Sequence, residues 1–302
     1  MRATDRTGLA IILSLVALTL FDSMGLIIKH LSDVYSAAEL SAWRNLFGLV
    51  PSIIALWTSK VWRKTGRRLK IRQWKLALLR GAVVTFAQLS FYMALGLMAF
   101  ATASTITYAS ALFTTALAIP ILGERVGWVR WGAVLVGFVG VVMVIRPTGA
   151  GFNLYALLPL AAAAFYALVG VTARLFDDDV PSPLVNLYAS TTSVIGATLI
   201  AYFWGGFTPI ASANDMGWIM LMGMLGGTAV LFLVVSYRMT EQSNLAPFSY
   251  FGIPLAFVLG WFFFDEAPWS TLFPGALLIA CGGLMIVWRE RSRSKPVPKL
   301  HQ

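Results

Sequence analysis

Ionisable and amide side chains inside long apolar runs are the residues of this chain whose types and spacing suggest chemistry. Asp22 lies deep in the first apolar run, with no basic residue near it in the sequence. Because an ionisable side chain is costly in lipid, such a residue usually serves a function. Asp22 is therefore a candidate for proton coupling or for binding a substrate amine. The alternatives are a carboxylate satisfied by a neighbouring helix and one that faces a wet cavity without titrating.

A second polar group lies in the middle of the third apolar run. Thr85, Gln88 and Tyr92 fall on one face at helical spacing. Gln88 could bind a substrate carboxylate or ammonium, or it could form a helix–helix hydrogen bond. Arg44 is a candidate to attract a substrate carboxylate, but its position near a helix end favours a side chain that snorkels to the interface.

The composition requires these residues to sit in a membrane. Hydrophobic residues make up 58% of the 302-residue chain and charged residues 12%, against about 25% charged residues in soluble domains. With one cysteine, two distant histidines and no P-loop, HExxH or GxSxG motif, no enzyme, metal site or cofactor is expected. The net charge of +10 lies on membrane flanks, so we expect no nucleic-acid partner.

Ten apolar runs are long enough to cross a bilayer, which takes about 20 residues. The sequence therefore predicts an all-α integral membrane protein with ten transmembrane helices. The runs are 8–28, 37–58, 75–97, 101–122, 128–146, 153–174, 184–204, 216–237, 244–264 and 269–288. With both termini in the cytoplasm, nineteen lysines and arginines lie inside and two outside, as the positive-inside rule requires.

The chain also repeats itself at an offset of 142 residues, where Tyr108 matches Tyr250 and Glu124 matches Glu266. Each half has five crossings, an odd number, so the second half must be inverted. We predict a first repeat over 1–148, a second over 149–292 and a basic cytoplasmic tail over 293–302. Inverted repeats are typical of secondary transporters, whose substrate site lies between the halves.

The run 94–147 holds Ala-Thr-Ala-Ser-Thr-Ile-Thr-Tyr, ending at Tyr108, then Leu-Gly-Glu-Arg and glycines 132, 137 and 140. It resembles the repeat of the EamA branch of the drug/metabolite transporter (DMT) superfamily, and the run 243–288 resembles it too. Within that branch the chain looks most like the YddG-type exporters of aromatic and other amino acids. The resemblance implies a central cavity lined by crossings 1, 3, 4, 6, 8 and 9, with crossings 5 and 10 as a peripheral support.

Aromatic residues within those crossings are the predicted substrate contacts, because aromatic faces suit apolar substrates and attract an ammonium. Together with Gln88 and Tyr92, the predicted substrate-binding set contains Tyr108, Phe165, Tyr166, Phe248 and Tyr250. Pro247 and Pro254 remove backbone donors from the ninth crossing and are the predicted hinge. Glu124 and Glu266 are expected to cap the helices that follow them, with a gating role as the alternative.

These features predict a transporter in a bacterial-type inner membrane that exports neutral and aromatic amino acids by alternating access. Its partners are a small-molecule substrate and the lipid bilayer, and it can be a monomer. Two other cargoes stay open. Lipophilic cations or drugs would require an acidic cavity residue, and phosphorylated metabolites or nucleotide-sugars would require basic ones.

Overall fold

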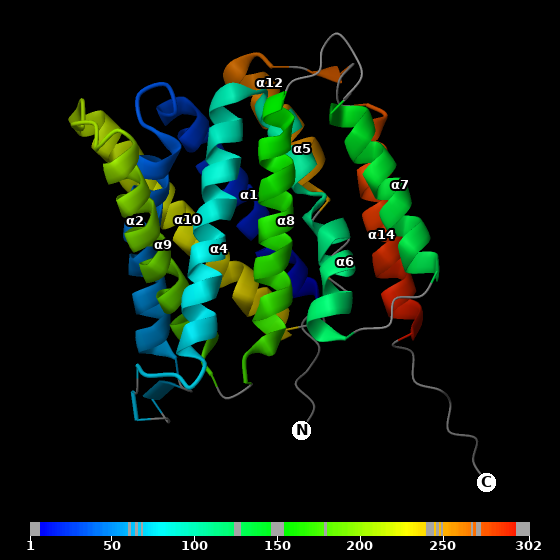
Figure 1. The fold of residues 1–302 in the computed structure, drawn as a ribbon, viewed down its shortest axis with the longest axis horizontal. Coiled ribbons are helices and arrows are strands. Elements are labelled where there is room, and N and C mark those ends of the chain that lie inside the picture. Colours follow the sequence, from blue (N-terminus) through cyan, green and yellow to red (C-terminus); the bar gives the residue numbers. More distant parts are fainter. Residues whose placement is uncertain are drawn as a thin grey trace.

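The computed structural model is a bundle of long helices (Figure 1). It describes residues 7–59, 62–63, 66–67, 69–123, 128–145, 154–177, 180–239, 245, 248, 250–266, 268–269 and 273–293, and none of these is in a strand. The all-α prediction is therefore confirmed for the described residues.

Each predicted run contains a helix. The helices are α1 (Thr7–Leu31), α2 (Ala37–Thr58), α4 (Trp74–Leu97), α5 (Phe100–Thr107), α6 (Ser110–Leu122), α7 (Trp128–Ile145), α8 (Leu157–Thr172), α9 (Ser182–Trp204), α10 (Ala213–Met239), α12 (Gly252–Phe264) and α14 (Gly275–Arg293). Within the described part, six helical segments are long and apolar enough to cross a membrane. They are Gly8–Leu31, Trp74–Leu97, Phe100–Leu122, Leu154–Thr172, Pro183–Trp204 and Ala213–Leu233. Trp131–Ile145 and Gly252–Phe264 are apolar but shorter.

Local chemistry sets several helix ends. Ser36 and Glu39 form a reciprocal capping box at the start of α2. Gly123 ends α6 with φ 68°, and Asp265 ends α12 with φ 54°. Both residues adopt the left-handed conformation that commonly terminates helices.

The fourth predicted crossing is broken in its middle, which its sequence pattern does not indicate. Tyr108 and Ala109 form a turn between α5 and α6. In the ninth crossing, Tyr250 and Phe251 form a turn before α12. Tyr108 and Tyr250 are the pair that the 142-residue repeat predicts, so the repeat places the two breaks at equivalent positions.

The break in the ninth crossing changes the role expected of Pro254. This proline lies in the first turn of α12, where its missing N–H costs no intrahelical hydrogen bond. Pro254 thus belongs to the restart of the helix, after the bend. Pro247 lies outside the described residues, and the hinge stays a prediction.

Helix pairing is reciprocal between the two halves of the chain. α1 packs on α10 and α12, as α8 packs on α4 and α6. α2 lies between α9 and α10, as α9 lies between α2 and α4. α1, the first helix, begins at the end of the bundle where the last helix, α14, ends (Figure 1). We call the opposite end, where α1 ends and α2 begins, the outer end, after the predicted orientation.

α7 and α14 pack chiefly against each other at one side of the bundle (Figure 1). Their backbones touch through glycines, because a Cβ on Gly140 would lie 2.6 Å from the Gly275 carbonyl oxygen. A Cβ on Gly282 would lie 2.7 Å from the Ala133 carbonyl oxygen. This arrangement agrees with the support role expected for the fifth and tenth crossings.

Candidate functional site

Buried polar atoms without a hydrogen-bond partner mark the interior of the bundle. Within the described part of the chain they are Asp22 Oδ2, Arg44 Nε, Arg80 Nε, Ser104 Oγ, Thr105 Oγ1 and the Tyr250 hydroxyl. Four of them belong to α1, α5 and the turn before α12, and these helices contact one another. Since an unpaired buried polar group is costly, this concentration makes the region a candidate site for a ligand or a proton.

Asp22 is buried, with 7% of its surface exposed. The Tyr108 side chain lies within electrostatic range of its carboxylate. Ser104 lies one helical turn before Tyr108, whose N–H donates to the Ser104 carbonyl at the end of α5. Asp22, Ser104 and Tyr108 lie on elements that contact one another next to the break between α5 and α6, which makes them candidates for the polar side of a site.

The Tyr108 ring is held against the start of α12. A Cβ added to Gly252 would overlap the Tyr108 hydroxyl oxygen and the ring carbon that carries it. Gly252 is therefore required by the close approach of Tyr108. The contact joins the break in the fourth crossing to the break in the ninth.

Gln88 lies in a helix–helix hydrogen-bond network between α4 and α2. Its Oε1 accepts from the Ser41 hydroxyl at 2.9 Å and from the Asn45 side-chain amide. Asn45 also donates to the Ser41 carbonyl at 2.8 Å. This is the structural role named above as the alternative for Gln88, and a substrate role for Gln88 stays a prediction.

The prediction that Arg44 snorkels to the interface is wrong. Arg44 is 7% exposed, and its Nη1 donates to Asn45 Oδ1 at 3.0 Å. The sequence did carry a signal for this burial. Ser41, Asn45, Gly48 and Ser52 recur at helical spacing, and all four are buried on the inward side of α2 together with Arg44.

The predicted aromatic set divides between the core and the periphery. Tyr92 is buried at 1% exposure and Tyr250 at 8%, and Tyr166 is half-buried within electrostatic range of Tyr92. Phe165 instead packs in a tilted ring contact on Phe86, with the ring centroids 6.0 Å apart, and Phe86 is 52% exposed. That contact places Phe165 toward the outside of the bundle. Phe248 is half-buried.

Lys29 and Glu266 tie three segments together at the outer end. Lys29 Nζ lies 3.0 Å from Glu266 Oε1 and donates to the Leu95 and Met98 carbonyls at 3.2 and 2.8 Å. Glu266 Oε2 accepts from the Phe100 N–H at 2.9 Å. Glu266 therefore caps α5, a helix from the other half of the chain, whereas the prediction was a cap on the next helix. Glu124 lies outside the described residues.

A second set of contacts closes the same end. The Tyr35 hydroxyl donates to Asp215 Oδ2 at 2.8 Å and accepts from the Ala211 N–H at 3.0 Å. Glu39 accepts from the Thr208 N–H. The α1–α2 loop is thereby bound to the α9–α10 loop.

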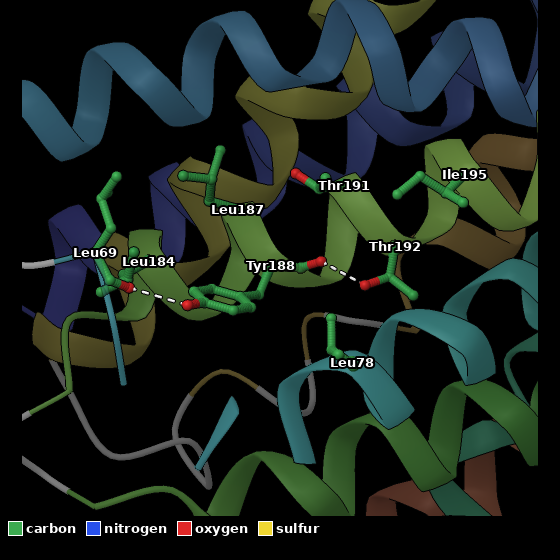
Figure 2. A pocket seen from close by; sticks show the side chains of 8 residues that line it. All are labelled: Leu69, Leu78, Leu184, Leu187, Tyr188, Thr191, Thr192 and Ile195. Carbon is green, nitrogen blue, oxygen red and sulfur yellow. Dashed lines mark hydrogen bonds between the residues drawn. The ribbon is translucent and has the colours of Figure 1, made fainter. Parts of the chain in front are cut away.

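An apolar groove of about 310 Å³ lies between α4 and α9 (Figure 2). It is lined by Leu69, Leu78, Leu184, Leu187, Tyr188, Thr191, Thr192 and Ile195. Two of its hydroxyls are engaged, since Tyr188 donates to the Leu69 carbonyl at 3.1 Å and Thr192 to the Tyr188 carbonyl at 2.9 Å. The groove contains none of the predicted site residues, and its lining suits an acyl chain.

The contact between Gly252 and Tyr108 is testable. Gly252→Ala should destabilise the protein by about 1–3 kcal/mol, the usual cost of overpacking, and should weaken transport by displacing Tyr108. Tyr108→Ala in the same chain should relieve the clash, giving a non-additive double-mutant cycle in thermal unfolding. Gly170→Ala, where a Cβ meets nothing within 4 Å, is the matched control. Additive effects of the two substitutions would contradict the contact.

Comparison with known proteins identifies the family to which this chain is similar. The model of the EamA-like transporter family matches residues 8–146 and again residues 153–288. An S-adenosylmethionine uptake transporter of Rickettsia bellii is 26% identical over 93% of this chain and 92% of its own length. A pseudopaline exporter of Pseudomonas aeruginosa is 23% identical over 89% and 92%. A riboflavin transporter of Rhizobium johnstonii is 31% identical over 58% and 57%.

Among the solved structures that share the fold is a crystal structure with a TM-score of 0.65 and 18% identity over 95% of this chain and 99% of the other. The family match covers both halves of the chain and includes the breaks at Tyr108 and Tyr250. The chain belongs to the EamA-like transporter family of the DMT superfamily, and it is a multi-pass membrane transporter of small molecules.

Proposed function

We propose that this transporter exports small zwitterionic metabolites, most notably neutral and aromatic amino acids, by alternating access. The observation that carries the proposal is the group of unpaired polar atoms buried beside aromatic side chains at the two helix breaks. A carboxylate, hydroxyls and aromatic faces can together hold an ammonium group and an apolar side chain. Broken helices at equivalent places in two repeats are also where transporters of this kind bind substrate.

The proposed architecture is ten crossings in two inverted repeats, 1–148 and 149–292, with both termini in the cytoplasm. Three observations support it. The family model matches the chain twice, the helix pairings are reciprocal between the halves, and α1 begins at the end of the bundle where α14 ends.

S-adenosylmethionine is a second candidate substrate. Relatives from Rickettsia that are 25–27% identical along nearly the whole chain are described as its uptake transporters. The molecule carries an α-amino acid group and an aromatic base, so the same polar atoms and aromatic side chains suit it. Because the relatives include both an uptake transporter and an exporter, the experiment below also measures the direction of transport.

Counterflow in proteoliposomes tests the proposal. Vesicles preloaded with unlabelled substrate are offered labelled phenylalanine, methionine, threonine or S-adenosylmethionine. A sugar phosphate and a quaternary amine serve as competitors. We expect accumulation of an amino acid above that in protein-free liposomes, insensitive to the sugar phosphate. Flux of only the sugar phosphate or only the amine would reject the proposal, and flux of S-adenosylmethionine alone would select the second candidate. Assays on right-side-out and inside-out vesicles then give the direction.

A further inference from the structure

Arg44 is a buried cation without an acidic partner. It lies in α2, seven residues from the start of that helix, and is 7% exposed. Within the described part of the chain, no carboxylate lies at ion-pair distance from it, and its Nε has no hydrogen-bond partner. Among the described residues, the Nη1 contact to Asn45 is the one hydrogen bond that holds the guanidinium in place.

The guanidinium reaches across to α10. A Cβ on Gly226 would lie 2.7 Å from Arg44 Nε and 2.9 Å from Nη2, and it would also meet the Met24 sulfur. The charged end of Arg44 therefore lies where α1, α2 and α10 meet. The hydroxyl groups of Tyr92 in α4 and Tyr166 in α8 are both close enough to interact electrostatically with the Arg44 guanidinium. Helices from both halves of the chain surround this one charge.

The depth of Arg44 matches that of the other candidate groups. At about 1.5 Å per residue, Arg44 lies roughly 10 Å below the outer start of α2. By the same rise, Asp22 lies roughly 13 Å below the outer end of α1, and Tyr166 roughly 13 Å from the start of α8. The three side chains occupy one layer of the bundle.

An unpaired cation in such a layer is costly unless an anion joins it. The Asn45 amide that orients Arg44 is itself held by Ser41 and Gln88, so the guanidinium is preorganised. Its Nε has no hydrogen-bond partner but is covered by α10 at Gly226, so a carboxylate reaches this edge when α10 and the Met24 side chain move aside during alternating access. We propose that Arg44 is the anchor for the carboxylate of the transported molecule. This inference rests on the proposed transport of zwitterions and adds the residue that binds their carboxylate.

A carboxylate suits Arg44 better than a phosphate monoester does. One guanidinium balances one negative charge and matches the two carboxylate oxygens through its fork. A phosphate monoester carries up to two charges. Lys29, the basic residue near the outer end of α1, is already engaged by Glu266.

The first test compares pairs of compounds that differ only in this group. Phenylalanine, methionine and S-adenosylmethionine are each paired with the matching amide or decarboxylated compound in counterflow inhibition. In the unmodified protein we expect the carboxylate forms to bind about 10- to 100-fold more tightly, the range for hydrogen bonds to a charged group. Arg44→Gln should remove that preference, and Arg44→Lys should retain part of it. Equal preference in the unmodified protein and Arg44→Gln would overturn the proposal.

Stability gives a second readout that a purely structural arginine would not produce. Arg44→Met removes a buried unpaired charge while keeping its volume, so we expect thermal stability to be unchanged or raised while carboxylate transport is lost. A fall in both together would show that Arg44 serves the fold and would overturn the proposal.

Gly226→Ala tests the geometry without changing charge. Its methyl group should push the guanidinium and Met24 aside and weaken carboxylate binding more than binding of the amide. Gly217→Ala on the same helix, where a Cβ meets nothing within 4 Å, should leave both unchanged. Equal weakening of both ligands by Gly226→Ala would contradict a direct contact.

The amino-acid function and the role of Arg44 can be rejected independently of each other. Arg44-dependent transport of a carboxylate other than an amino acid would reject the proposed amino-acid function and retain the role of Arg44. Amino-acid transport that ignores the carboxylate would retain the function and reject the anchor.

Discussion

Glu266→Gln is expected to open the outer end of the protein. The substitution keeps the shape of the side chain but removes the charge that pairs with Lys29 and caps α5. Loss of the pair releases the end of α12 from α1 and from the α4–α5 junction. The same contacts join both halves of the chain, so their release should favour an outward-open state.

The expected size follows from burial. The Lys29 and Glu266 side chains are 13% and 27% exposed, so the pair is only partly screened by water. A loss of about 1–2 kcal/mol corresponds to a shift of roughly 5- to 30-fold in the ratio of open to closed forms. Lys29→Met should act in the same direction, because Lys29 also donates to the Leu95 and Met98 carbonyls.

Cysteine labelling measures this shift. In a Cys281→Ser background, Ser104→Cys places a thiol one turn inside α5, at a side chain that is buried in the closed form. Its rate of reaction with a membrane-impermeant maleimide from outside should rise by the factor above in Glu266→Gln. Asp265→Asn is the matched control, since it neutralises the adjacent exposed carboxylate and should leave the rate unchanged. Equal rates in Glu266→Gln and the unmodified protein would show that other contacts close this end.

Asp22→Asn is expected to separate exchange from concentrative transport. Asparagine keeps the size and hydrogen-bonding capacity of Asp22 but cannot take up and release a proton. If one proton accompanies each substrate, a gradient of one pH unit supports about tenfold accumulation. Asp22→Asn should abolish that accumulation while leaving counterflow within a few fold, because exchange requires no net proton movement.

The buried, unpartnered Oδ2 of Asp22 motivates this expectation. Asp33→Asn, at an exposed acid just beyond the end of α1, is the control and should retain full accumulation. Loss of counterflow together with accumulation would assign Asp22 to binding of the substrate amine instead. Accumulation that survives in Asp22→Asn would remove Asp22 from coupling.

The helical content and the family follow from the sequence because both depend on local pattern. Twenty apolar residues in lipid must satisfy their own backbone hydrogen bonds, so each long run becomes a helix wherever it packs. The repeat likewise locates equivalent positions without any contact, as for Tyr108 and Tyr250. Those two residues mark both helix breaks, although neither run predicts a break by itself.

The partners of the polar side chains depend on tertiary structure. Hydropathy assigns Arg44, Gln88 and Phe165 to helices but does not specify the rotation of each helix or the neighbour that it faces. Packing decides these, and it buries Arg44 against Gly226, binds Gln88 to Asn45 and turns Phe165 toward Phe86.

The contacts at the outer end likewise depend on tertiary structure, because they join residues that are far apart in the sequence. Glu266 caps α5 across 166 residues of sequence, while sequence proximity predicts a cap on the next helix. The sequence alone determines an apolar, repeated, helical transporter and several of the residues that form its core. Tertiary structure decides which of these residues meet, because inter-helix contacts depend on crossing angles and close glycine packing that no local pattern encodes.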